Sequence, residues 1–185
     1  MADLFVISGN QAAGKTTVAT LLAERFPRGV HVEADDLQRM IVSGCRWPDV
    51  SDDIDVATGR VIGEAGAQLT ARLRNACLLS RSFVGEGFTT VLTDIIVGWR
   101  FQELMGNLAG VPFHFVMLRP SVEVLHQRER ERASGSNEWE EHIEGGIEEM
   151  PHVGLWLDTR AWTASETVDE ILNRRSEGLV GAQPR

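Results

Sequence analysis

The sequence predicts a single α/β domain in which a five-stranded parallel sheet lies between helices, in three layers. Short apolar runs of strand character alternate with segments that carry apolar residues at helical spacing. A chain of 185 residues is long enough to bury one proper core. Charged side chains recur where the predicted strands end, which is where parallel sheets bind ligands. We expect the domain to cover residues 1–177 and residues 178–185 to form a flexible tail.

The first predicted strand, residues 4–8, leads into GNQAAGKT at residues 9–16, which matches the phosphate-loop (P-loop) pattern G-x-x-x-x-G-K-[ST]. A helix predicted at residues 15–26 follows, and its N-terminus together with the loop N–H groups attracts anions. Lys15, the only lysine, is expected to reach the β- and γ-phosphates, and the Thr16 hydroxyl to ligate Mg²⁺. The predicted nucleotide-binding residues here are Gly9, Asn10, Gln11, Ala12, Ala13, Gly14, Lys15, Thr16 and Thr17.

The next elements follow from turn signals and periodicity. Pro27 to Gly29 stops the first helix, and a turn-rich acidic stretch separates a short helix from a long one that is rich in alanine and leucine. Gly63 and Gly66 interrupt the long helical pattern. We expect a strand at residues 30–34, helices at 37–42 and 56–79 with the turn-rich stretch 43–55 between them, a strand at 89–93 and a helix at 97–108.

The C-terminal part begins with FHFVML, which is typical of a buried strand. Ser121 is a plausible N-cap for the helix after it, and Thr163 with Glu166 forms a capping box for the last helix. A polar, glycine-bearing stretch between these helices indicates a mobile segment. We expect strands at residues 113–118 and 155–158, helices at 121–132 and from 163 to about 175, and the mobile segment at 133–146.

Composition restricts the classes of partner. The net charge of −9 argues against nucleic acid or an anionic membrane surface as the main partner. Cys45 and Cys77 form no CxxC pair, and the five histidines are scattered singly, so neither a disulfide framework nor a metal cluster is predicted. Neither a signal peptide nor an apolar run of membrane-spanning length is visible. We expect a cytoplasmic protein whose partner is a small molecule; the oligomeric state stays open.

Four charged residues stand at the carboxyl ends of predicted strands, on the edge where the P-loop lies: Asp35, Asp94, Arg119 and Asp158. Asp35 can accept the proton of an acceptor hydroxyl and contact Mg²⁺ through water, although an aspartate there can also cap the next helix. We favour Asp35 as the base and Asp36 as a cap or substrate contact. Asp94 ends a strand of Walker-B type and can serve the Mg²⁺ shell, a substrate group or a helix cap.

Two further features indicate an acceptor site and a lid. Arg128 and Arg132 are four residues apart, on one face of a predicted helix beside a mobile loop, which suits a lid at about residues 128–146; a solvated charged helix is the alternative. Trp47 can line an acceptor pocket or cover the core, whereas the other four tryptophans are expected to be packing residues. The predicted substrate-binding residues are Asp36, Arg39, Trp47 and Asp94.

The order of these motifs resembles small P-loop kinases, more narrowly the chloramphenicol phosphotransferase-like group and more distantly gluconate and shikimate kinases. The resemblance depends on these motifs and their order: GxxxxGKT, Ala34-Asp35-Asp36-Leu37, Leu118-Arg119-Pro120-Ser121, Arg128 with Arg132, and Leu157-Asp158-Thr159. The resemblance implies a P-loop NTPase fold with a helical lid and transfer of the γ-phosphoryl group of ATP, with Mg²⁺, to a hydroxyl of a small molecule such as an antibiotic, sugar or nucleoside. It implies that Asp35 is the base, that Arg132 is a lid arginine, and that Arg128, Asp158 and Thr159 lie near adenine. Apart from the resemblance, we expect Lys15 to bind the phosphates and Arg128 and Arg132 to close over the transferring group. Residues 43–55 match no substrate signature of these families.

Two rival functions remain open. One is a regulatory NTPase that hydrolyses nucleotide without an acceptor; the other is a zeta-toxin-like kinase of a UDP-sugar, which would need basic residues such as Arg39, Arg46, Arg72 and Arg74 near the acceptor. A Rossmann dinucleotide site is excluded because the loop lacks G-x-G-x-x-G. A Ras-like GTPase is excluded because the guanine-specifying N/T-K-x-D motif cannot occur in a chain with a single lysine at residue 15.

Overall fold

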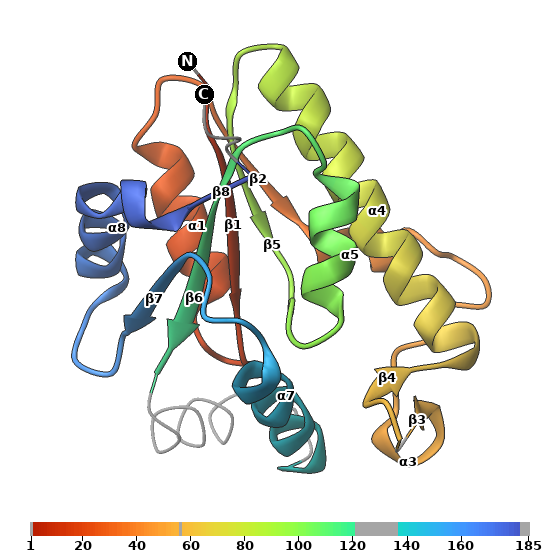
Figure 1. Cartoon of the computed structure of the whole chain (residues 1–185). Helices are drawn as coiled ribbons and strands as arrows, with labels where there is room; N and C mark the ends of the chain where they lie inside the picture. Colours follow the sequence, from red (N-terminus) through yellow and green to blue (C-terminus); the bar gives the residue numbers. More distant parts are fainter. Residues whose placement is uncertain (1, 56, 121–136, 182–185) are drawn as a thin grey trace.

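The computed structural model describes residues 2–55, 57–120 and 137–181. Five parallel strands stand in the order β2-β5-β1-β6-β7, which confirms the predicted sheet, and β8 adds an antiparallel partner to β6 (Figure 1). Because β1 pairs with β5 on one side and β6 on the other, the P-loop leaves the middle of the sheet. The strands are β1 (Leu4–Gly9), β2 (Gly29–Glu33), β5 (Thr89–Thr93), β6 (Phe113–Arg119), β7 (Leu155–Asp158) and β8 (Leu179–Val180).

Helices cover both faces of the sheet, so the three-layer prediction is confirmed (Figure 1). On one face α1 (Lys15–Glu24) and α8 (Ala164–Asn173) bury apolar residues against alternate side chains of the strands. On the other face α4 (Gly63–Gly85) and α5 (Arg100–Asn107) do the same. Two cores of buried apolar side chains therefore hold the sheet rigid, and the loops at the carboxyl ends of its strands are supported from both sides.

Strand β2 ends at Glu33, and α2 (Ala34–Arg39) begins at once, which corrects the prediction of a helix at residues 37–42. Asp35 therefore lies in the first turn of a helix rather than at the end of a strand. An acidic residue in that turn faces the positive end of the helix dipole, which favours an early start of the helix.

A small β-hairpin replaces the first turns of the long helix predicted from residue 56. Its strands, β3 (Ile54–Asp55) and β4 (Arg60–Val61), follow the short helix α3 (Val50–Asp53), and α4 begins only at Gly63. Within the turn, Oδ1 of Asp55 accepts hydrogen bonds from the N–H groups of Ala57 and Thr58, each at 3.0 Å. An aspartate that binds the backbone two or three residues ahead stabilises a turn, and this competes with helix formation.

The polar segment predicted to be mobile at residues 133–146 is in large part a helix, α7 (Asn137–Glu149). Its apolar residues Trp139, Ile143 and Ile147 recur every four positions, and Ile143 and Ile147 are buried in the core that contains α4. The high acidic content of the segment obscured this stripe, which is the ordinary pattern of an amphipathic helix. The helix predicted at 121–132, its cap at Ser121 and the start of the lid lie outside the described residues.

At the C-terminus the capping box is confirmed: the Glu166 N–H donates to Oγ1 of Thr163, and the Thr163 N–H donates to Oε2 of Glu166. The flexible tail predicted from residue 178 is wrong for its first residues. Gly178 ends a 3-10 helix, η1 (Arg175–Gly178), and Leu179 and Val180 form β8 against β6. Among the described helices, none is long and apolar enough to cross a bilayer.

The capping box supports a first stability prediction. The Thr163→Ala variant removes the side-chain acceptor for the Glu166 N–H, so the free energy of unfolding should fall by about 1 kcal/mol in urea titrations. Thr163→Ser keeps the hydroxyl and should unfold at nearly the wild-type urea concentration. Equal loss in both variants would show that the methyl group, and not the cap, stabilises this helix.

Candidate active site

The P-loop is shaped by backbone conformations that favour glycine. Gly9 and Gly14 have φ angles of 151° and 88°, and Ala12 has a φ of 52°. A Cβ atom on Gly9 would lie 2.6 Å from the carbonyl oxygen of Leu118 on the neighbouring strand, so a side chain cannot be placed there. The loop then turns directly into α1, whose first N–H groups face the concavity that the loop encloses.

Lys15 folds back across this loop. Its Nζ donates to the carbonyl oxygens of Gly9 at 3.1 Å and Asn10 at 2.8 Å. These bonds hold the ammonium at the mouth of the concavity, where a triphosphate would lie. The arrangement fits the predicted role of Lys15 at the β- and γ-phosphates.

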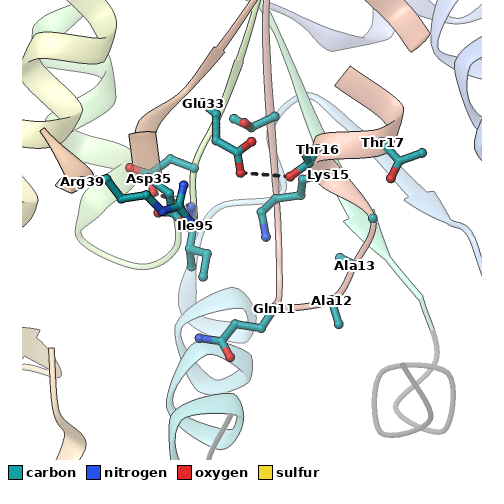
Figure 2. A pocket seen from close by; sticks show the side chains of 13 residues that line it. Gln11, Ala12, Ala13, Lys15, Thr16, Thr17, Glu33, Asp35, Arg39 and Ile95 are labelled. Atoms are coloured by element: carbon teal, nitrogen blue, oxygen red, sulfur yellow. Dashed lines mark hydrogen bonds between the residues drawn. The ribbon is translucent and has the colours of Figure 1, made fainter. Parts of the chain in front are cut away.

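A cavity of about 460 Å³ opens over the loop and α1. Its wall includes most of the predicted P-loop residues together with three other predicted site residues, Asp35, Arg39 and Asp94. Figure 2 shows Glu33 reaching Thr16 from the end of β2, and the Thr16 hydroxyl donates to Oε1 of Glu33 at 3.0 Å. Hydroxyl and carboxylate oxygens suit Mg²⁺, so a magnesium ion bound with the phosphates fits at Thr16 and Glu33.

Asp35 is held by an ion-pair network that begins in the core. Nη1 of Arg72 donates to Oδ1 of Asp35 at 3.0 Å, and Nη2 of Arg72 donates to Asp94 at 2.6 Å. Nη2 of Arg100 donates to the second oxygen of Asp94 at 2.7 Å. The side chains of Arg72, Asp94 and Arg100 are at least nine-tenths buried, whereas that of Asp35 is 42% exposed. Asp35 is thus the solvent-facing end of the network.

The network takes up both carboxylate oxygens of Asp94, and the Ile95 N–H adds a further bond to Oδ1 at 2.8 Å. Burial by itself would raise the pKa of Asp94, but the positive charges of Arg100 and Arg72 and the Ile95 amide hold that pKa below its ordinary value. Asp94 is therefore a buried anion that anchors two arginines. Of the predicted roles, that of helix cap is wrong, because the next helix, α5, begins at Arg100 with Trp99 at its N-cap. The roles in the Mg²⁺ shell and in substrate binding stay predictions.

A second cavity, of about 290 Å³, lies on the other side of Asp35. Asp35, Gln11 and Ile95 line both this cavity and the first, so the two spaces meet there. Trp47, from the turn-rich stretch, stands in its wall as predicted for an acceptor pocket. Trp99 and Trp139, which were expected only to pack, line it as well.

A third cavity, of about 270 Å³, adjoins the outer side of the P-loop. It is lined by Ala12, Gly14, Thr159 and Trp162, so it lies beyond the phosphates, as the base of a nucleotide would. Thr159 was predicted near adenine and lines this space. The neighbouring Asp158, predicted with it, is half exposed and pairs with Arg160 instead.

The remaining predicted residues are placed as follows. Asp36 and Arg39 pair with each other at 2.7 Å on the exposed side of α2, and of the two only Arg39 lines the first cavity. Arg128 and Arg132 lie outside the described residues, so their lid and phosphate roles stay predictions.

The P-loop also contacts helix α7. The Asn10 side-chain amide donates to the carbonyl oxygen of Glu140 and to the carboxylate of Glu144, and Arg119 pairs with Glu144.

Comparison with known proteins gives the family. A family model described as "AAA domain" matches residues 4–151. The chain belongs to this family. A comparison with curated proteins finds none that matches the chain.

Solved structures share the fold of this AAA-domain chain at low sequence identity. A sugar kinase from Janibacter sp. HTCC2649 is 16% identical over 96% of both chains, with a TM-score of 0.66. The tunicamycin resistance protein of Deinococcus radiodurans is 19% identical over 100% of both chains, with a TM-score of 0.68. Shikimate kinase from Acinetobacter baumannii is 18% identical over 94% of this chain and 92% of its own, with a TM-score of 0.62. The predicted P-loop kinase fold is confirmed; the narrower chloramphenicol phosphotransferase-like group is not.

Several residues of the site in this AAA-domain protein were not singled out from the sequence. Glu33 is an ordinary strand-end glutamate until the fold brings it to Thr16, 17 positions away. The sequence marks Arg72 only as one of several arginines, because nothing in a helix 37 positions downstream indicates a partner at Asp35. Trp162 lies close to the predicted adenine loop, and that proximity was the one available signal for it.

Proposed function

We propose that this AAA-domain protein is an ATP-dependent phosphotransferase that moves the γ-phosphoryl group to a hydroxyl of a small molecule. The observation that carries the proposal is the position of Asp35. It lines both the phosphate cavity and the adjoining aromatic cavity, and it is fixed there by the buried Arg72. A base between a phosphate site and an acceptor site is what in-line transfer to a hydroxyl requires.

The nucleotide is held by this chain's own groups. The loop N–H groups and the α1 N-terminus bind the phosphates, and Lys15 neutralises charge at the β- and γ-phosphates. Mg²⁺, bound at Thr16 beside Glu33, would supply further neutralisation of that charge. Trp162 and Thr159 provide a wall for the base. Arg128 and Arg132 are proposed to close over the transferring group.

The transfer joins the acceptor oxygen to the γ-phosphorus as the bond between that phosphorus and the β-γ bridging oxygen breaks, and ADP leaves. The acceptor proton passes to Asp35. Arg72 engages Oδ1, and within the described part of the chain Oδ2 has no hydrogen-bond partner, so Oδ2 is the oxygen available for that proton. Because phosphoryl transfer depends mainly on positioning and charge stabilisation, this set of groups is chemically sufficient.

The placement of the arginines bears on the UDP-sugar alternative. Arg39 pairs with Asp36, Arg46 with Asp53, and Arg72 with Asp35 and Asp94. Arg74 lines a different groove and not the cavity beside Asp35. None of the four presents an uncompensated charge to the acceptor cavity, so a diphosphate-bearing acceptor is disfavoured.

The proposal is tested by measuring ADP release from MgATP across a panel of hydroxyl compounds, with ³¹P NMR to detect a new phosphate ester. We expect release that depends on one class of acceptor, and Lys15→Ala should lower that activity by at least about 100-fold because a phosphate-binding cation is lost. Release that is equal with and without every acceptor, with no ester formed, would favour the regulatory NTPase.

A further inference from the structure

The cavity beside Asp35 is walled by aromatic rings. Trp47, Trp99 and Trp139 all line it, and Trp47 remains 45% exposed at its mouth. Trp99 and Trp139 are half-buried, and each has one neighbour on its ring: Arg60 lies over Trp99 and His142 stacks on Trp139. An exposed tryptophan at the mouth of a cavity is typical of ligand contact, and the two half-buried indoles extend that aromatic wall inward. Indole faces bind the C–H faces of sugar rings and also attract cations.

The two guanidinium groups in the wall are not available as anion receptors. Arg72 and Arg100 have side chains only 5% and 7% exposed, and together they neutralise Asp94 and hold Asp35. An anionic acceptor would have to separate these buried pairs, which leaves charges uncompensated in a poorly solvated place. Carboxylate and phosphate groups are therefore poorly matched to this wall.

Apart from Asp35, Arg72 and Arg100, the charged side chains in the wall of this cavity come from α7. Glu141 and Glu149 line the cavity from this helix, and neither forms an ion pair with another described residue. His142 stands between them in sequence; burial lowers its pKa despite the opposing effect of Glu149, so its ring is neutral at neutral pH. With Asp35, Arg72 and Arg100 included, the titratable groups of the wall carry a net negative charge.

We propose that the acceptor is an alcohol bearing a protonated amine, an amino sugar or a related amino alcohol. Its hydroxyl faces Asp35, its ring or carbon skeleton lies against the indoles, and its ammonium faces Glu141 and Glu149. This inference rests on the proposed function for the identity of the reacting hydroxyl. The net charge of −9 on the whole chain favours approach of a cation in the same way.

The test uses matched sets in which one scaffold carries an amine, a neutral group or a carboxylate, for example D-glucosamine, D-glucose and D-gluconate, with corresponding cyclitol and aromatic amino-alcohol sets. Binding is followed by tryptophan fluorescence without ATP, and transfer by ADP release. The amine member should exceed the neutral member by about fivefold or more in kcat/KM and in affinity, and the carboxylate by more. Equal or weaker binding of the amine members in every set, or no binding of any, would overturn the inference.

A pair of variants isolates the charge. Glu141→Gln with Glu149→Gln should lower the preference for the amine roughly five- to tenfold, whereas Glu148→Gln, on the same helix but outside the cavity wall, should leave it unchanged. An unchanged preference in the double variant would refute the role of these two carboxylates. Amine-selective binding without any phosphate ester would retain the charge inference and reject the kinase function.

Discussion

Asp35→Asn is expected to lower kcat for the phosphorylated acceptor by roughly 10²- to 10⁴-fold, with the Kd for MgATP nearly unchanged. The amide keeps the size of the side chain and can still approach Arg72, but it cannot take the acceptor proton. The phosphate contacts of the P-loop do not involve this side chain. Steady-state kinetics with the best acceptor of the panel measure the first quantity, and nucleotide titration measures the second.

Asp36→Asn is the matched control for that experiment. Asp36 is adjacent in sequence, but it pairs with Arg39 on the exposed side of α2 and lines neither of the cavities that meet at Asp35. Its variant should keep most of the wild-type kcat. Near-normal turnover in Asp35→Asn would remove Asp35 from the role of base, and a large loss in Asp36→Asn alone would move that role to its neighbour.

The parts of the fold that follow from short-range patterns were predicted correctly. The P-loop unit, the buried strand β6 and the capping box at Thr163 each depend on residues that are close together in sequence, so the pattern and the cause coincide. The hairpin at residues 54–61 was missed because this stretch was joined to the alanine- and leucine-rich helix that follows it. Its own sequence, IDVATGRV, consists mainly of β-branched residues and glycine, which favour strands and a turn.

The site was predictable only where the parallel sheet itself determines position. Because the carboxyl ends of parallel strands meet at one edge, the order of strands and loops in the sequence is enough to place Asp35 beside the P-loop. The partners of Asp35 and Asp94 could not be predicted in this way, since Arg72 comes from α4 and Arg100 from α5, and their approach depends on how these helices pack. The aromatic cavity likewise combines tryptophans from three separated segments, Trp47, Trp99 and Trp139.

Asp94→Asn is expected to be among the most destabilising single substitutions in the described part of the chain. It removes the anion between two buried guanidinium groups, and breaking a buried ion pair by removal of one partner costs about 3–5 kcal/mol. Urea unfolding at pH 7 measures the loss, with Asp36→Asn, an exposed pair, expected within about 0.5 kcal/mol of the wild type. A loss below about 1 kcal/mol in Asp94→Asn would mean that water or rearrangement compensates the arginines.

The ionisation of Asp94 also leads to a prediction about how the free energy of unfolding changes with pH. The pKa of Asp94 is lower in the folded protein than its ordinary value, because the charges of Arg100 and Arg72 exceed the opposing effect of burial. The stability that these interactions contribute is therefore fully present above the unfolded-state pKa of about 3.9, and it is lost as the pH falls toward the folded-state pKa. The free energy of unfolding of the wild type should fall steeply below about pH 4, and in Asp94→Asn it should fall less steeply. Parallel pH profiles in the two proteins would show that other carboxylates control the acid transition, and would remove Asp94 as its source.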